Sequence, residues 1–246
     1  MRTFTKFATP EVKQMLQDLL DSANDSEKYR ASMHSLGGHL AASLFQIESF
    51  LTRTSLNVCV ACSVEDADFL ASGFIDGLKS RGVADSRLKL VCFWNDRVKS
   101  FEGKSTESFD LAPIVKTYRE VKDLSNSVLV IVKSIISGAC VVKTNLSDLI
   151  DDSTPQQIFV VAPVMLKGAK KRSGSEFSKD VAFKFEYLAF AEDDQKLGEF
   201  VDPGIGGSVY ERLGFADKNS YVPMIVSERR QALAGAIGVS LGTWKN

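Results

Sequence analysis

The chain has 246 residues, of which 44% are hydrophobic and 25% are charged, and its formal net charge at pH 7 is -1. This length suits one large domain, and the charge balance argues against a protein that binds nucleic acid through overall basicity. No apolar run approaches the roughly 20 residues that span a bilayer, and the N-terminus lacks the apolar centre of a secretion signal. We therefore expect a cytoplasmic protein with no membrane segment and no nucleic-acid partner.

The N-terminal part of the sequence is typical of helices. The run Thr9-Pro10-Glu11 combines a capping residue with a first-turn proline, and apolar residues follow it at helical spacing. A second helix is predicted over 26–51, with an interruption at Gly37-Gly38. We expect residues 1–55 to form a helical region that packs on a core made of residues 56–246, within a single domain overall.

From residue 56 onwards, apolar strand-like runs alternate with helical runs. Strands are predicted at 56–62, 87–94, 128–132, 156–164 and 183–191, and helices at 66–82, 138–150 and 166–172. This alternation predicts an α/β fold with a mostly parallel, twisted sheet flanked by helices. Ligands of such sheets bind beyond the carboxyl ends of the strands. Functional residues are therefore expected in the loops after Val60, Trp94, Val132, Val161 and Phe190.

Other segments have weaker patterns. The polar run 95–106 suits a mobile loop over a site, and 173–180 suits a surface insertion. The C-terminal run 227–246 is typical of an amphipathic helix. Cys59 and Cys62 have the CxxC spacing of a zinc or redox pair, but no second such pair follows, so buried reduced thiols are favoured.

The run Ser137-Gly138-Ala139-Cys140 lies between a predicted strand and a predicted helix. Small residues there allow backbone N–H groups to converge on a phosphate at the positive end of the helix. An ordinary strand-to-helix turn also uses small residues, so both interpretations stand. A second glycine-rich run, 200–214, has neither the position nor the following acid of a dinucleotide fingerprint.

Together these segments resemble type I phosphoribosyltransferases, which transfer a ribosyl phosphate from phosphoribosyl pyrophosphate (PRPP) to a base. The run VLVIVKSIISGACVVK is similar to their PRPP loop. The runs VVAPVMLKGAKK and VDPGIGGSVYERLG are similar to the next strand and helix, and to the uracil-binding segment, of uracil phosphoribosyltransferases. The resemblance covers about 27–214 and implies a type I phosphoribosyltransferase-like fold with N-terminal helices.

The resemblance also implies which residues bind. The phosphate or PRPP residues it implies are Lys133, Ser134, Ser137, Gly138, Ala139, Cys140 and Arg97. The base-binding residues it implies are Val201, Pro203, Gly204, Ile205, Gly206 and Gly207.

This sequence departs from the family pattern at positions where the family has acidic residues. Val132 and Lys133 occupy the positions of the acidic residues that hold the ribose hydroxyls, and Gly207 and Tyr210 stand where the base segment has aspartates. The resemblance implies Mg²⁺ as a cofactor, but the carboxylates that belong with it are missing at these positions. We therefore assign no catalytic residue and no metal site.

The charged residues near the expected pocket allow two interpretations each. The Lys133 ammonium either reaches solvent or pairs with a phosphate in place of part of the metal. The basic residues Lys167, Lys170, Lys171 and Arg172 either form a solvated helix face or join the site. The acidic run Glu192-Asp193-Asp194 is either exposed or binds a metal.

Three functions follow from this sequence. The first is a uracil phosphoribosyltransferase-like enzyme with a rebuilt site, and the second is a non-catalytic nucleotide or phosphosugar-binding regulatory or assembly subunit. The third is a structural role without a ligand. The expected ligand is a phosphorylated small molecule such as PRPP or a nucleotide, and both a homo-oligomer and a partner protein remain open.

Overall fold

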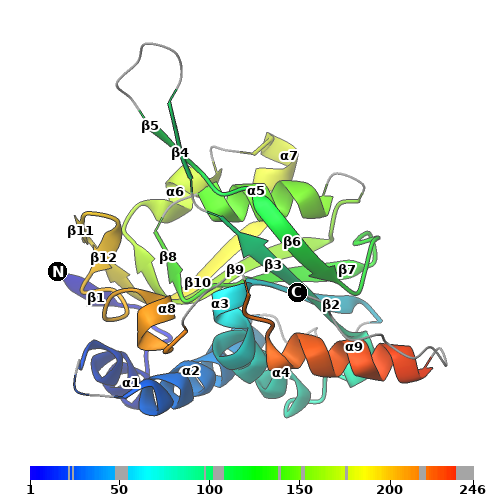
Figure 1. Ribbon diagram of the computed structural model, residues 1–246, viewed down its shortest axis with the longest axis horizontal. Helices are drawn as coiled ribbons and strands as arrows, with labels where there is room; N and C mark the ends of the chain where they lie inside the picture. The colour runs from blue at the N-terminus through cyan, green and yellow to red at the C-terminus, as the bar shows by residue number, and fades with distance from the viewer. Residues whose placement is uncertain are drawn as a thin grey trace.

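In the computed structural model, a central sheet lies between two layers of helices (Figure 1). The residues that the structure describes are 1–21, 23, 25–47, 55–96, 98–101, 108–137, 140–150, 153–174, 177–215 and 220–236. No helix within these ranges is both long enough and apolar enough to cross a membrane.

Within the described part of the chain, eight strands form the central sheet. Their bounds are Arg2–Phe4 (β1), Asn57–Ser63 (β2), Leu88–Asn95 (β3), Ile114–Arg119 (β6), Ser127–Val132 (β7), Ile135–Ile136 (β8), Gln157–Leu166 (β9) and Phe185–Asp193 (β10). The order across the sheet is β1-β10-β9-β7-β2-β3-β6, and the short β8 pairs with β9. The five central strands are parallel, whereas β1 and β6 are antiparallel to their neighbours.

The burial of the strands explains which of them the sequence reveals. In β7 all six residues are buried, and in β2 six of seven are, because helices cover both faces of the sheet. The edge strands β1 and β6 have no fully buried residue, so their sequences carry no apolar run. The prediction of a mostly parallel α/β sheet is confirmed. The two antiparallel edge strands, β1 and β6, were not predicted.

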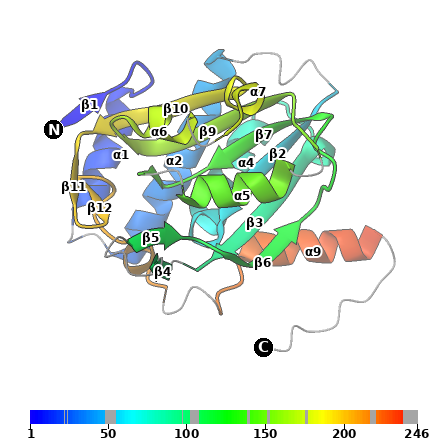
Figure 2. The ribbon, with the colours of Figure 1, turned by 90° about the horizontal axis from the view of Figure 1, so that it is seen from above.

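Helices cover both faces of the sheet. Below it in Figure 1 lie α1 (Pro10–Leu20), α2 (Ser26–Ile47), α4 (Ser72–Lys79) and α9 (Met224–Ala236). Above it lie α5 (Cys140–Ile150), α6 (Ala169–Gly174) and α7 (Lys179–Ala182), and Figure 2 shows α5 and α6 lying across the strands. Shorter turns are α3 (Val64–Asp66), the π-helical η2 (Ala67–Ala71), the 3-10 turn η3 (Asp85–Arg87) and α8 (Val209–Arg212).

Two hairpins stand apart from the central sheet. They pair β4 (Val98–Phe101) with β5 (Ser108–Leu111), and β11 (Gln195–Leu197) with β12 (Phe200–Asp202). The first hairpin projects from the top of the molecule in Figure 1 and includes part of the predicted loop 95–106. The second lies beside β1, and its strand β12 begins the glycine-rich run 200–214.

The predicted interruption of the second helix at Gly37-Gly38 is wrong, because α2 is continuous through both glycines. These small residues serve close packing against α4 instead of a break. A Cβ on Gly37 would lie 2.1 Å from the Leu70 carbonyl oxygen, and one on Gly73 would lie 1.9 Å from the His34 carbonyl oxygen. Backbone therefore meets backbone at this crossing, which holds α2 close to η2 and α4.

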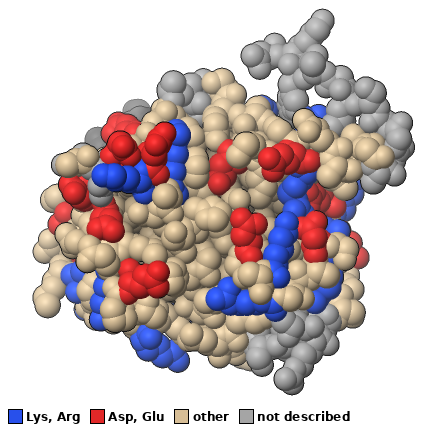
Figure 3. All heavy atoms as spheres, turned by 90° about the horizontal axis from the view of Figure 1, so that it is seen from below, with Lys and Arg blue, Asp and Glu red and all other residues tan. Residues whose placement is uncertain are grey.

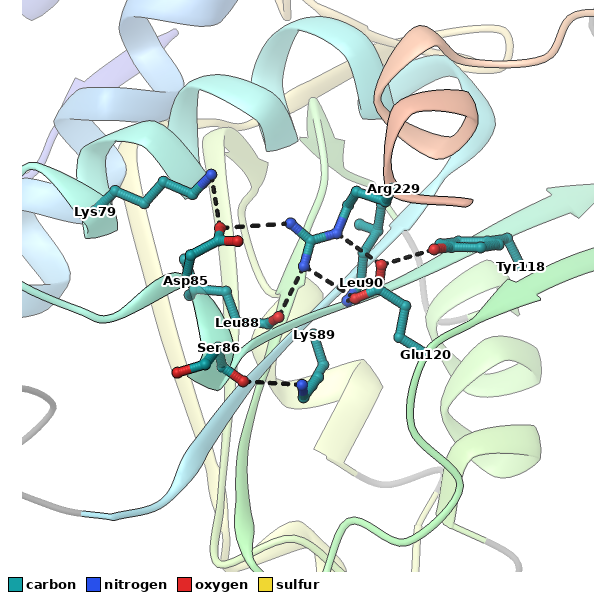
Figure 4. Close-up of polar contacts among 9 residues, drawn as sticks. All are labelled: Lys79, Asp85, Ser86, Leu88, Lys89, Leu90, Tyr118, Glu120 and Arg229. Atoms are coloured by element: carbon teal, nitrogen blue, oxygen red, sulfur yellow. Dashed lines mark hydrogen bonds and ion pairs between the residues drawn. The ribbon is translucent and has the colours of Figure 1, made fainter. Parts of the chain in front are cut away.

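An arginine fixes the C-terminal helix α9 to the edge of the sheet. Arg229 donates to both carboxylate oxygens of Glu120 at 2.7 and 3.0 Å, and to the Leu88 carbonyl oxygen at 2.7 Å (Figure 4). Tyr118 donates to the same carboxylate at 2.7 Å.

Acidic and basic side chains are interspersed on the face seen from below (Figure 3). Among the residues described on this face, they form no broad patch of one sign.

The cysteines of the CxxC run lie in separate parts of the core. Cys59 packs in the hydrophobic cluster on one face of the sheet and Cys62 in the cluster on the other face. Burial raises the pKa of the Cys59 thiol to about 12. Because the two thiols point to opposite faces of β2, they cannot bind one metal ion together.

Candidate functional site

The candidate site lies at the point in the sheet where the order in which the strands are added changes direction. After β2 the chain adds β3 on one side, and β7, β9 and β10 then follow on the other side. The carboxyl ends of β2 and β7 are therefore neighbours at a topological switch point, and Cys62 pairs with Val132 there. Open α/β sheets bind their ligands at such a point.

A cavity of about 290 Å³ opens at this switch point. On the sheet side it is lined by Glu65, Asn95, Lys133, Ser134, Ile135 and Ser137. On the other side it is lined by Glu199, Phe200, Val201, Ile205, Gly207, Ser208, Val209 and Tyr210. Residues from the two segments that the sequence singles out, separated by more than sixty positions, thus share one cavity.

Some of the residues implied by the family resemblance do not line this cavity. Pro203, Gly204 and Gly206 lie in the same turn as the lining residues but are not part of the wall. Cys140 begins α5 directly after the Ser137 loop. Gly138, Ala139 and Arg97 lie outside the described residues.

Lys133 lies at the floor of the cavity and is 8% exposed, so the interpretation in which its side chain reaches solvent is wrong. Its Nζ donates to Ser63 Oγ at 3.2 Å and lies 3.7 Å from Oδ2 of Asp66. Asp66 is buried and also accepts from the Ser134 N–H at 3.0 Å and from Ser63 Oγ at 3.1 Å. The ammonium that replaces the family's acid is therefore matched by a carboxylate from the neighbouring strand end.

Glu65 and Asp66 are two residues of the site that were not predicted from the sequence. Both directly follow β2, which ends at Ser63 beside the end of β7. The signal was available in the sequence as two acids after an apolar strand. The family resemblance places its acids after a different strand, and the helix predicted over 66–82 took Asp66 as its first residue.

The pKa values of the Glu65 and Asp66 carboxyl groups are shifted in opposite directions. Burial raises the pKa of Asp66 to about 6, although the Lys133 charge opposes this shift. Burial acts on Glu65 in the same direction, but Lys133, the Glu65 N–H and the hydroxyls of Tyr210 and Ser63 together hold its pKa below the ordinary value. Glu65 is therefore a carboxylate at neutral pH, and it faces the cavity.

A hydrogen bond across the cavity joins its two sides. The Tyr210 hydroxyl, on α8, donates to Oε2 of Glu65 at 2.9 Å. Tyr210 occupies a position where the family pattern has an aspartate, and here it meets an acid from the other side of the cavity. The contact fixes α8 relative to the end of β2.

The glycine-rich turn beside the cavity is shaped by its glycines. Gly204 has φ +57° and a Cβ there would lie 2.2 Å from the Val201 carbonyl oxygen, while one on Gly206, at φ +80°, would lie 2.2 Å from that of Leu19. Only glycine fits both positions. The Tyr29 hydroxyl of α2 donates to the Ile205 carbonyl oxygen at 2.9 Å, so the N-terminal helices hold this turn in place.

The acidic run 192–194 braces the same turn. Asp193 is fully buried and accepts from Nε and Nη2 of Arg2, each at 2.8 Å, and from the Gly204 N–H at 2.8 Å. Arg2 also donates to the Gly204 carbonyl oxygen. Neither interpretation of this run holds for Asp193, because its carboxylate is buried and its partners are an arginine and a backbone amide.

A pair of amide side chains positions α5 above the cavity. Asn95, at the end of β3, exchanges two hydrogen bonds with Asn145 of α5, at 2.8 and 3.1 Å. Asn95 also lines the cavity. The N-terminus of α5, which carries the helix's partial positive charge, follows directly after the loop that Ser137 begins.

Comparison with known proteins gives likeness in fold alone. Neither a protein-family model nor a curated protein matches this sequence. The solved structure of the AQ2163 protein from Aquifex aeolicus is similar, with a TM-score of 0.63 and 15% identity over 89% of this chain and all of that one. This likeness supports the α/β fold described above.

Phosphoribosyltransferases are also among the solved structures that resemble the chain, at lower scores. An adenine phosphoribosyl transferase from Trypanosoma brucei, in complex with AMP, pyrophosphate and ribose-5-phosphate, has a TM-score of 0.46 and 11% identity over 93% of this chain and 94% of that one. A hypoxanthine-guanine phosphoribosyl transferase from L. donovani has a TM-score of 0.41 and 12% identity, over 65% and 77%.

Proposed function

We propose that the cavity at the switch point binds a nucleoside monophosphate, with a uracil nucleotide as the first ligand to test, and that binding requires no metal ion. The observation that carries the proposal is the single cavity that both family-like segments line. Its residues divide into a polar half, from the ends of β2 and β7, and a more apolar half, from β12 and the glycine-rich turn.

The phosphate fits the β7 side of the cavity. Ser137 supplies a hydroxyl and begins the loop that enters α5, an 11-residue helix whose N-terminus favours an anion. Lys133 supplies an ammonium at the cavity floor, although Asp66 and Ser63 already share it. One monophosphate suits this limited positive charge better than the several anionic groups of PRPP.

The sugar and the base fit the rest of the cavity. The ionised Glu65 carboxylate accepts hydrogen bonds and therefore suits the hydroxyl groups of a ribose. Phe200, Val201 and Ile205 form an apolar surface on the opposite side, which suits the face of a planar base.

The Mg²⁺ of the family does not fit the residues present. At the end of β7, where the family pattern has an acid, Lys133 places an ammonium that repels a cation. Within the described residues, no group of three or more histidine, cysteine, aspartate or glutamate side chains could hold a metal ion.

Isothermal titration of UMP tests the proposal. We expect wild type to bind UMP with the same affinity in EDTA and in Mg²⁺, and Ser137→Ala to bind it at least about fivefold more weakly through the lost hydrogen bond. Ser35→Ala, an exposed serine on α2, is the matched control. Absence of heat from UMP, ribose 5-phosphate and PRPP in both buffers would contradict the proposal.

Phosphoribosyl transfer is the second candidate function, and Glu65 favours it. This carboxylate lies in the cavity and is held ionised, so it provides an acid that β7 lacks. Incubation with PRPP, Mg²⁺ and each nucleobase, followed by a pyrophosphate assay, separates the two functions. Pyrophosphate release that depends on base and disappears in Glu65→Gln would favour an enzyme over a binding protein.

A further inference from the structure

A buried carboxylate shares the ammonium at the floor of the switch-point cavity. The Asp66 side chain has no exposed surface, and its Oδ2 lies 3.7 Å from Nζ of Lys133. Lys133 itself lines the cavity, on the side to which the proposed function assigns the phosphate. A bound phosphate and Asp66 therefore compete for the same ammonium, and both carry negative charge.

The charge balance around Asp66 changes when an anion enters the cavity. Its carboxylate is stabilised by the Lys133 ammonium, by the Ser134 N–H at 3.0 Å and by the Ser63 hydroxyl at 3.1 Å. A phosphate at the cavity floor adds negative charge nearby and draws the ammonium toward itself. Both effects favour the neutral form of the carboxyl group, because a nearby like charge and the loss of a cation each disfavour the ionised form.

The Ser63 hydroxyl provides an acceptor for a proton on Asp66. A protonated carboxyl group donates one hydrogen bond, and a buried donor needs a partner. Ser63 Oγ lies 3.1 Å from Oδ2 of Asp66 and accepts from Nζ of Lys133 at 3.2 Å. When Lys133 turns toward a phosphate, Ser63 Oγ loses that donor and accepts from the new O–H instead, since a hydroxyl group both donates and accepts.

The other ionisable side chains close to Asp66 keep their charge between pH 6 and pH 8. Burial raises the pKa of the Tyr29 hydroxyl on α2, so this group stays neutral. The neighbouring Cys92 thiol and burial raise the pKa of Cys62 on β2 in the same way. The pKa of Glu65 lies below its ordinary value, so Glu65 stays ionised.

Groups further from Asp66 do not supply the pH dependence either. Arg212 of α8 lies over the Tyr29 ring, 4.9 Å from its centroid, and an arginine keeps its charge throughout this range. Histidine is the side chain that ordinarily titrates here. The chain has two, His34 and His39, and each lies on α2 beside a carboxylate of α4 or α1. Neither is among the described residues that line the cavity.

We propose that nucleotide binding in the switch-point cavity is coupled to protonation of Asp66, so that the cavity holds its ligand more tightly as pH falls. This coupling rests on the proposed function, since it requires an anion beside Lys133. The proton comes from solvent and forms an O–H bond at Oδ2, and no other covalent bond changes. With a pKa of about 6, Asp66 is ionised at pH 8 in the free protein, so affinity rises as pH falls from 8 to 6 and levels off below.

Isothermal titration of UMP at pH 7 in PIPES, MOPS and imidazole buffers measures the proton uptake. These buffers differ in heat of ionisation, and the slope of the binding heat against that heat gives the number of protons taken up. We compare wild type with Asp66→Asn. Asp76→Asn, on the exposed side of α4, is the matched control, because it makes the same change outside the cavity. The UMP phosphate also titrates near this pH, but it does so in every variant, so the difference between variants belongs to Asp66.

We expect wild type to take up about 0.4 proton more than Asp66→Asn, and the control to match wild type. Asp66→Asn also removes the competitor for Lys133, so it should bind UMP at least about fivefold more tightly than wild type at pH 8 and only about twofold more tightly at pH 6. A purely structural role of Asp66 would give weaker binding at both values. Circular dichroism confirms that each variant is folded.

Uridine 5′-sulfate provides a measurement that needs no variant, because a sulfate ester does not titrate between pH 6 and pH 8. Its binding to wild type at pH 7 should take up protons and should strengthen about twofold from pH 8 to pH 6. Equal proton uptake by wild type and Asp66→Asn, or binding of the sulfate ester without proton uptake, overturns the coupling and leaves the proposed function intact. Absence of binding heat from UMP overturns both.

Discussion

Replacing Lys133 with methionine tests whether the floor of the cavity is a buried ion pair. Methionine keeps the length and apolar stem of lysine but removes the ammonium. Asp66, which has no exposed side-chain surface, is then left with two hydrogen-bond donors and no cation. Removing one partner of a buried pair typically costs about 3–5 kcal/mol of unfolding free energy, and we expect this cost at pH 8.

The cost should depend on pH in a defined direction. The pKa of Asp66 is raised to about 6 in the folded wild type, so between about pH 4 and pH 6 the folded protein holds a proton that the unfolded chain has lost. This carboxyl group therefore makes the protein less stable as pH rises through that window. Without Lys133, which lowers the pKa of Asp66, the window extends to higher pH, and we expect the variant to lose only about 1–2 kcal/mol at pH 5.

Urea denaturation at pH 5 and pH 8 measures both values. The double variant Lys133→Met/Asp66→Asn carries neither charge, so it should recover most of the stability that the single variant loses at pH 8. A single variant as stable as wild type at pH 8 would show that Lys133 is solvated. A double variant no more stable than the single one would show that Asp66 is not the partner.

Four further substitutions test the buried ion pair beside the cavity and the packing of the helices. Asp193→Asn should lower the unfolding free energy by about 3 kcal/mol because Arg2 loses its buried partner, and it should weaken UMP binding in the same titration that measures wild type. Arg229→Ala should cost about 2 kcal/mol in urea denaturation through its contacts with Glu120, and an unchanged midpoint would contradict the anchoring of α9. Gly73→Ala should cost at least about 2 kcal/mol, whereas Gly235→Ala, which meets open space, should stabilise by about 1 kcal/mol.

The strands and helices could be predicted because local patterns of apolar residues indicate them. The buried runs of β2, β3, β7, β9 and β10 are nearly continuous apolar stretches, and this is the signature of a parallel sheet covered on both faces. The two family-like segments also line the cavity together. The edge strand β6 was not predicted because its side chains are exposed or only half-buried, so its sequence contains no continuous apolar run.

The charges of the site could not be predicted from the same patterns. Lys133 looked unpaired because its partner Asp66 is 67 positions away and follows another strand. Asp193 looked like part of an exposed acidic run because its partner Arg2 lies at the other end of the chain. Both pairings depend on strand order, β2 beside β7 and β1 beside β10, and no local pattern encodes it.

A crystal soaked with UMP in the presence of EDTA tests the central claim most directly. We predict density for the nucleotide in the switch-point cavity, with its phosphate at Ser137 and the N-terminus of α5, its ribose hydroxyls at Glu65 and its base against Phe200 and Ile205. An empty cavity, or a nucleotide bound only elsewhere on the molecule, would contradict the account.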